Sequence, residues 1–342
     1  MIHLFDNPHP VNHLVILFLA LFLPLGFYWD PPATQLGDSF ISWSFGSQIS
    51  GIFEEGTAWL VFLKSILIYV QSLYFNRICS SVGLFHHHTL LPATVFVICA
   101  SYLSVFFSFH LLLIGFFFFL MAIEQLLNVK KAEDRFAENL FYSTFFVSVA
   151  SLFFTGYGYF IIWVWLLLPA IGAMTLRHFV LSITGFVMPY FLAGVYFFTM
   201  DNFMAYLVWL QDAIPSFTFF AADFNNALWI PVLFFLLGWL KYKSAGVRLL
   251  QETKAGFTIF QVALIPGFLQ FFLPVESLEY GFYLFLPGFA VFINYFFFEK
   301  KEKLTRKIAF LVYIAFAFIL PWALWLRRLW IEWLEDVPFF GS

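Results

Sequence analysis

The sequence predicts an all-α membrane protein: a polytopic transmembrane helix bundle of about 11 spans, with 10–12 also consistent with the hydropathy pattern. Three observations lead to this fold class. Of the 342 residues, 62% are hydrophobic and 11% are charged, whereas water-soluble chains carry roughly 25% charged residues. The apolar residues form runs long enough to cross a bilayer. The basic residues between these runs gather on one side of the predicted membrane.

Apolar runs of about 17 residues or more define the predicted spans. They cover residues 11–28, 57–75, 89–106, 110–126, 138–156, 158–175, 179–200, 227–242, 256–273, 281–298 and 308–326. Some connections are very short, so the helices that they join should be antiparallel neighbours. The first ten residues contain no Lys or Arg, which is unlike a signal peptide, so we expect a retained first helix. Residues 1–342 are expected to form a single transmembrane domain.

The basic residues predict the orientation. With the N-terminus in the cytoplasm, fourteen of the seventeen Lys and Arg residues fall in inner connections: Arg77, Lys130, Lys131, Arg135, Arg177, Lys241, Lys243, Arg248, Lys254, Lys300, Lys301, Lys303, Arg306 and Lys307. Only Arg327 and Arg328 fall outside, and Lys64 lies within a span. This asymmetry follows the positive-inside rule. We therefore expect an integral protein of the inner (cytoplasmic) membrane with a cytoplasmic N-terminus.

The predicted outer side is acidic and carries two long connections, residues 29–56 and 201–226. Both contain aromatic residues, so we expect short interfacial helices in each. A third interfacial helix and a tail are expected over residues 327–342, where apolar residues recur at helical spacing. Long and partly structured loops often carry function, so the outer face is the better candidate for a functional site.

Lys64 is the most conspicuous binding candidate, together with its nearest acidic neighbours in sequence, Glu54 and Glu55. Insertion of a lysine near the centre of a span costs about 2.5–3.5 kcal/mol on insertion scales, so a lysine in this position usually has a structural or functional role. Two interpretations stay open. Lys64 either snorkels to the outer interface or forms a structural pair, or it binds an anionic substrate.

Asp30 and Asp38 are weak catalytic candidates, because polyprenol-dependent glycosyltransferases place an acidic base in the first outer loop. Here the two acids are eight residues apart and form no compact motif, and Asp30 precedes a proline, which favours a turn. Outer arginines that could hold a lipid pyrophosphate are nearly absent. Whether the chain is an enzyme stays open.

Neither a metal nor another cofactor is expected. The dense histidine cluster, His86 to His88, has no partner pair within a span that would complete a metal site. No basic cluster is dense enough for nucleic acid. Phe is over-represented, with 54 residues. It could line a path for a polyisoprenoid, carotenoid or fatty chain, but lipid-facing Phe in place of Leu is the favoured interpretation.

A few short motifs carry a resemblance. Phe75-Asn76 before a polar loop, Leu91-Pro92 at the start of the next span, and Arg177-His178 followed by Pro189 resemble an uncharacterised polytopic inner-membrane protein family of Bacteroidota. Its members are sometimes labelled automatically as β-carotene monooxygenases. The resemblance implies an inner-membrane location, and the histidine pattern gives the monooxygenase label no support.

The sequence therefore favours a bacterial inner-membrane protein of the cell envelope that handles a lipid or lipid-linked substrate at its outer (periplasmic) face. The alternative is a non-catalytic membrane subunit that anchors or stabilises a larger secretion or assembly complex. A third interpretation is a transporter that uses polar residues within spans, such as Gln71 and Glu124, although these usually bind helices together. The expected partners are membrane lipids, and either a lipid-linked substrate or other membrane-protein subunits.

Overall fold

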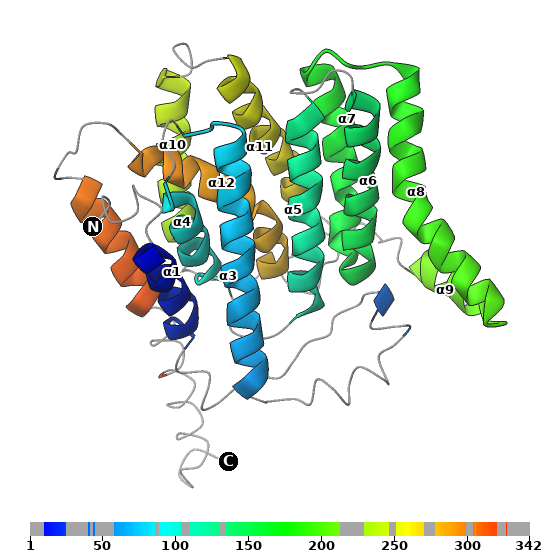
Figure 1. The fold of residues 1–342 in the computed structure, drawn as a ribbon, viewed down its shortest axis with the longest axis horizontal. Helices are drawn as coiled ribbons and strands as arrows, with labels where there is room; N and C mark the ends of the chain where they lie inside the picture. Colours follow the sequence, from blue (N-terminus) through cyan, green and yellow to red (C-terminus); the bar gives the residue numbers. More distant parts are fainter. Residues whose placement is uncertain are drawn as a thin grey trace, which may run out of the picture.

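The computed structural model is a bundle of helices (Figure 1). It describes residues 10–24, 40–41, 44, 58–85, 89–103, 110–129, 135–212, 229–245, 251–269, 278–298, 304, 306–319 and 326. The described residues are almost entirely helical, which confirms the all-α fold class.

The structure describes eleven α-helices with assigned bounds and one 3₁₀ helix within these ranges. Their bounds are α1 Pro10–Phe22, α3 Ala58–Ser81, α4 Leu91–Ala100, α5 Leu111–Val129, α6 Phe136–Phe153, the 3₁₀ helix η5 Thr155–Tyr159, α7 Phe160–Ala170, α8 Leu176–Thr199, α9 Phe203–Asp212, α10 Trp229–Ala245, α11 Gln251–Leu269 and α12 Leu278–Phe297. Residues 306–319 are also helical.

Each of the eleven predicted spans overlaps a helix of the structure. Within the described residues, four helices are long and apolar enough to cross a membrane: Trp59–Ser81, Leu111–Val129, Phe136–Phe153 and Leu176–Thr199. Other apolar helices, such as α1 and α4, are shorter. The structure therefore supports a membrane protein with four candidate spans, and the number eleven stays a prediction.

Aromatic side chains fill the core between the central helices. The ring of Phe119 on α5 lies 4.5 Å from that of Phe160 on α7, between centroids. Phe116 lies 4.7 Å from Tyr283 on α12, and both phenylalanines are buried. Such pairs add specific geometry to the burial of a large apolar surface. Part of the high Phe content therefore serves packing between helices, in addition to any lipid-facing role.

Glycines allow α5, α6 and α8 to approach closely. A Cβ atom on Gly185 of α8 would lie 2.6 Å from the main-chain oxygen of Phe141 on α6. A Cβ atom on Gly115 of α5 would lie 3.0 Å from the main-chain oxygen of Ala150, also on α6. Small residues at helix contacts are typical of membrane bundles, in which close van der Waals packing drives association. The contact between α6 and α8 therefore depends on the absence of a side chain at Gly185.

A lysine joins the carboxyl ends of α10 and α12. Lys241 Nζ donates to the main-chain oxygens of Tyr295, Phe296 and Phe298 at 3.0, 3.1 and 3.0 Å. A cation at this position satisfies carbonyls that the end of α12 leaves free and complements the helix dipole. The carboxyl ends of α10 and α12 therefore lie at the same end of the bundle.

Several of the basic residues that the structure describes lie at that end. Helix ends that Figure 1 shows at the top of the bundle carry Arg77 (α3), Arg135 (α6), Arg177 (α8), Lys243 (α10) and Lys254 (α11). The short helix α9 lies at the opposite end (Figure 1). Basic residues that lie in separate connections of the sequence are therefore found at one end of the helix bundle.

We expect Gly185→Ala to destabilise the protein. The added methyl group meets the main chain of α6, and overpacking of this kind costs about 1–3 kcal/mol. Gly158→Ala is the matched control, because its Cβ would have ordinary contacts of 3.6 and 3.8 Å with Ser151 and Phe186. Thermal unfolding in detergent should show a lower Tm for Gly185→Ala only. Equal Tm values for the two variants would contradict the close contact.

Candidate functional site

The structure describes one of the five residues that the sequence singled out. Asp30, Asp38, Glu54 and Glu55 lie outside the described residues. Lys64 lies on α3, and its side chain is 0% exposed. This burial disfavours snorkelling, because the ammonium group does not reach the molecular surface. Structural pairing of Lys64 and the binding of an anionic substrate by Lys64 both stay predictions.

Polar side chains near Lys64 in the sequence join helices of the bundle. Gln71, two turns further along α3, donates from Nε2 to the main-chain oxygen of Leu113 on α5 at 2.5 Å. Its Oε1 accepts from the hydroxyl of Tyr283 on α12 at 3.1 Å. The hydroxyl of Tyr74 donates to Glu124 on α5. Gln71 and Glu124 therefore form hydrogen bonds between helices, which is the usual role of polar residues within spans.

The described histidines do not assemble into a metal site. No group of three or more His, Cys, Asp or Glu residues with suitable geometry occurs within the described ranges. His110 is buried, and its Nδ1 accepts from the main-chain N–H of Leu112 at 2.9 Å, at the start of α5. His86 to His88 lie outside the described residues.

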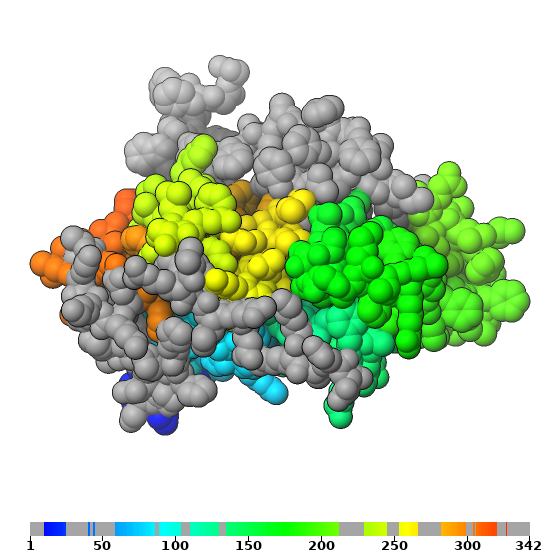
Figure 2. Space-filling model, turned by 90° about the horizontal axis from the view of Figure 1, so that it is seen from above, coloured from blue at the N-terminus to red at the C-terminus, as the bar shows by residue number. Residues whose placement is uncertain are grey.

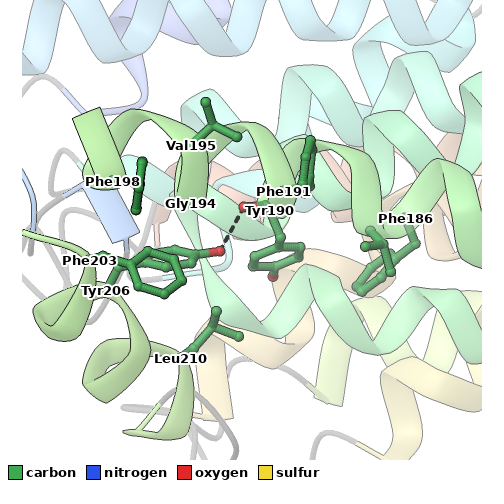
Figure 3. Close-up of a pocket in the computed structure, with 10 residues that line it drawn as sticks. Phe186, Tyr190, Phe191, Gly194, Val195, Phe198, Phe203, Tyr206 and Leu210 are labelled. Carbon is green, nitrogen blue, oxygen red and sulfur yellow. Dashed lines mark hydrogen bonds between the residues drawn. The ribbon is translucent and has the colours of Figure 1, made fainter. Parts of the chain in front are cut away.

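An apolar groove lies between α8 and α9 (Figure 3). Its volume is about 660 Å³. The lining consists of Phe186, Val187, Tyr190, Phe191, Gly194, Val195 and Phe198 from α8, and of Phe203, Tyr206 and Leu210 from α9. Figure 3 shows Phe198 and Phe203 at one end of the groove and Phe186 at the other. Lys64 is not among the lining residues, so the groove is separate from the polar candidate.

Tyr206 connects the two helices beneath the groove. Its hydroxyl donates to the main-chain oxygen of Tyr190 at 2.7 Å, shown as a dashed line in Figure 3. Its ring lies against Gly194, where a Cβ atom would be 3.1 Å from Tyr206 Cε1. The hydroxyl of Tyr190 lies 2.7 Å from Ser151 Oγ on α6. Both phenolic groups of the lining are therefore bonded to the protein.

An aromatic cluster holds α9 against α8 and joins it to the first predicted outer connection. The ring of Phe40 lies 5.6 Å from Phe197 on α8 and 4.8 Å from Trp209 on α9, between centroids. Phe197 and Tyr206 stack at 5.9 Å. Parts of the two long connections that the sequence placed on one face, residues 29–56 and 201–226, thus contact each other.

The fold of α9 onto α8 follows from how α8 ends. Asp201 has a positive φ of 55°, a conformation that Asp and Asn adopt more readily than most side chains. The N–H of Asn202 donates to the oxygen of Phe197 at 2.9 Å, and the N–H of Asp201 donates to that of Phe198 at 3.2 Å. This is the Schellman arrangement. It reverses the chain, so that α9 returns along α8.

Pro189 lies near the middle of α8. Proline removes a main-chain donor and bends helices, and Figure 1 shows the lower half of α8 leaning away from the bundle. In the space-filling view, the light green residues at the end of α8 and in α9 form one edge of the molecule (Figure 2). The groove therefore lies at the periphery, at the end of the bundle opposite the basic residues.

Sequence reasoning found the aromatic character of residues 201–226 but did not find the groove. A signal for it exists in α8, where Phe186, Tyr190 and Gly194 recur at intervals of four residues and so share a helix face. Every apolar span shows similar patterns, so this signal alone does not distinguish α8 from the other helices.

No protein-family model, curated protein or solved structure matches the chain. The resemblance to the Bacteroidota membrane-protein family therefore stays a prediction, and the candidate site is argued from its own geometry.

We expect Tyr206→Phe to loosen α9. The substitution removes the hydrogen bond to Tyr190 and leaves the ring in place, at a cost of about 0.5–1.5 kcal/mol. Hydrogen exchange of the α9 amides should become faster, whereas Tyr142→Phe, which changes an exposed tyrosine of α6, should leave it unchanged. Unchanged exchange in both variants would show that ring packing alone holds α9.

Proposed function

We propose that this chain is a bacterial inner-membrane protein of about eleven spans that handles a lipid or lipid-linked substrate at its outer face. The observation that carries the proposal is the apolar groove between α8 and α9. Its volume of about 660 Å³ lies within the range of roughly 300–1,000 Å³ that is typical of sites for small molecules.

The lining suits a hydrocarbon ligand. Seven of the ten lining residues belong to α8, a candidate span on which Val187, Phe191, Val195 and Phe198 are exposed. In a bilayer, the exposed face of a span contacts acyl chains. A hydrocarbon chain could therefore enter the groove sideways from the membrane without crossing water.

The position of the groove supports the outer face. Arg135, Arg177 and Lys243 lie at helix ends at the other end of the bundle, and basic residues favour the cytoplasmic side. With that end in the cytoplasm, α9 and the groove face the periplasm. The N-terminus of the chain is then cytoplasmic.

The topology predicts where introduced cysteines react. Eleven spans place Asn7→Cys in the cytoplasm and Ser342→Cys outside, and Ser244→Cys at the end of α10 serves as a second cytoplasmic marker. Cys79 and Cys99 are buried, so background labelling should be low. A membrane-impermeant maleimide should label only Ser342→Cys in intact spheroplasts. Labelling of both termini from one side would require an even number of spans.

The proposed function predicts that the protein retains less lipid when a larger side chain fills the groove. Val195 lines the groove and is 45% exposed, whereas Leu192 is 50% exposed on the same helix and is not a lining residue. Val195→Trp should reduce the lipid that native mass spectrometry detects on the purified protein severalfold, because the indole occupies the groove. Leu192→Trp should retain the wild-type amount.

Equal lipid retention by Val195→Trp, Leu192→Trp and the wild type would contradict the proposal. Both variants should show the wild-type Tm, because each places the larger side chain on an exposed face of α8. A difference in lipid retention at equal Tm therefore reports on the groove rather than on folding.

A further inference from the structure

We infer that the groove between α8 and α9 binds the hydrocarbon tail of an outer-leaflet lipid whose head group carries no net negative charge. This inference rests on the proposed function and specifies the substrate class. Three properties of the groove lead to it: its length, the state of its polar groups and the charge at its mouth.

The length corresponds to one leaflet. Along α8 the lining extends from Phe186 to Phe198, a distance of twelve residue steps, or about 18 Å at 1.5 Å per residue. One leaflet of hydrocarbon is about 15 Å thick, half of a core of about 30 Å. A tail of ordinary membrane length therefore fits the groove along its whole length, whereas a chain long enough to cross both leaflets would extend beyond it.

The described lining residues offer a ligand few hydrogen-bonding groups. Among the lining residues that the structure describes, only Tyr190 and Tyr206 have polar side-chain groups, and their hydroxyls bond to Ser151 and to the main chain of Tyr190. Insertion of a polar head group would leave it without partners, which is costly in an apolar site. The groove therefore selects a hydrocarbon tail, and the head group stays at the mouth.

We take as the mouth the end of the groove that Phe198 and Phe203 line, where α8 turns into α9 and a carboxylate is exposed. Asp201 is exposed at this turn, between Phe198 and Phe203 of the lining. The chain contains no Lys or Arg between Arg177 and Lys241. Phosphate groups are usually bound by arginine or lysine, and neither α9 nor the part of α8 beyond Arg177 supplies one. A zwitterionic or uncharged head group has no net negative charge for the carboxylate of Asp201 to repel.

The test compares two phospholipids that differ only in head group. Phosphatidylcholine and phosphatidylglycerol, each with the same diazirine-labelled acyl chain, are incorporated separately at equal low concentration into nanodiscs of unlabelled phosphatidylcholine that contain the full-length protein. After irradiation, the labelled peptides of α8 and α9 are quantified. We expect at least threefold more label from phosphatidylcholine.

Asp201→Asn tests the cause of this preference. Asparagine tolerates the positive φ of this position, so the turn is retained while the charge is removed. The ratio of label from phosphatidylcholine to label from phosphatidylglycerol should fall toward one. Val195→Trp should reduce labelling from both lipids, with Leu192→Trp as the unaffected control.

The outcomes separate the two proposals. The wild type could be labelled equally by the two lipids, or more strongly by phosphatidylglycerol, while Val195→Trp still reduces labelling by both. This result would overturn the head-group inference and leave the proposed function standing. An unchanged preference in Asp201→Asn would overturn the role of Asp201. Absence of label from α8 and α9 with both lipids would overturn the proposed function itself.

Discussion

The close contact between α8 and α6 is the constraint on which the candidate site depends. Gly185 lies directly against the main chain of α6, and α6 packs in turn on α5 through Gly115. Within a bilayer, the hydrophobic effect does not drive helices together, so close packing must do so. Because the first half of α8 is fixed in this way, the half after Pro189 can lean outward and meet α9.

Several polar side chains of the bundle join helices through main-chain oxygens. Gln71 bonds to Leu113, Tyr206 bonds to Tyr190, and Lys241 bonds to the end of α12. A buried polar group is costly unless it has a partner, and the main chain supplies acceptors wherever a helix ends or bends. As a consequence, the groove retains an apolar lining although it contains two tyrosines.

Hydropathy predicted the positions of the helices well, because the length of an apolar run depends on local sequence alone. A helix overlaps each predicted span, and α9 occurs in a connection whose aromatic residues had indicated one. The groove could not be predicted in this way. It depends on Tyr206 lying over Gly194, twelve residues away in the sequence, and on the turn at Asp201. These are properties of tertiary packing.

Lys64 is the main binding candidate in the sequence, because a charged residue within a span is costly and usually has a structural or functional role. The described lining residues of the groove include no charged residue, and Lys64 lies elsewhere, buried on α3. In a membrane protein a site for a hydrocarbon ligand has little need of charge, since the ligand is recognised by shape and by length. The proposed site is marked by the reversal of the chain at Asp201, where α8 ends and α9 begins, rather than by an unusual residue.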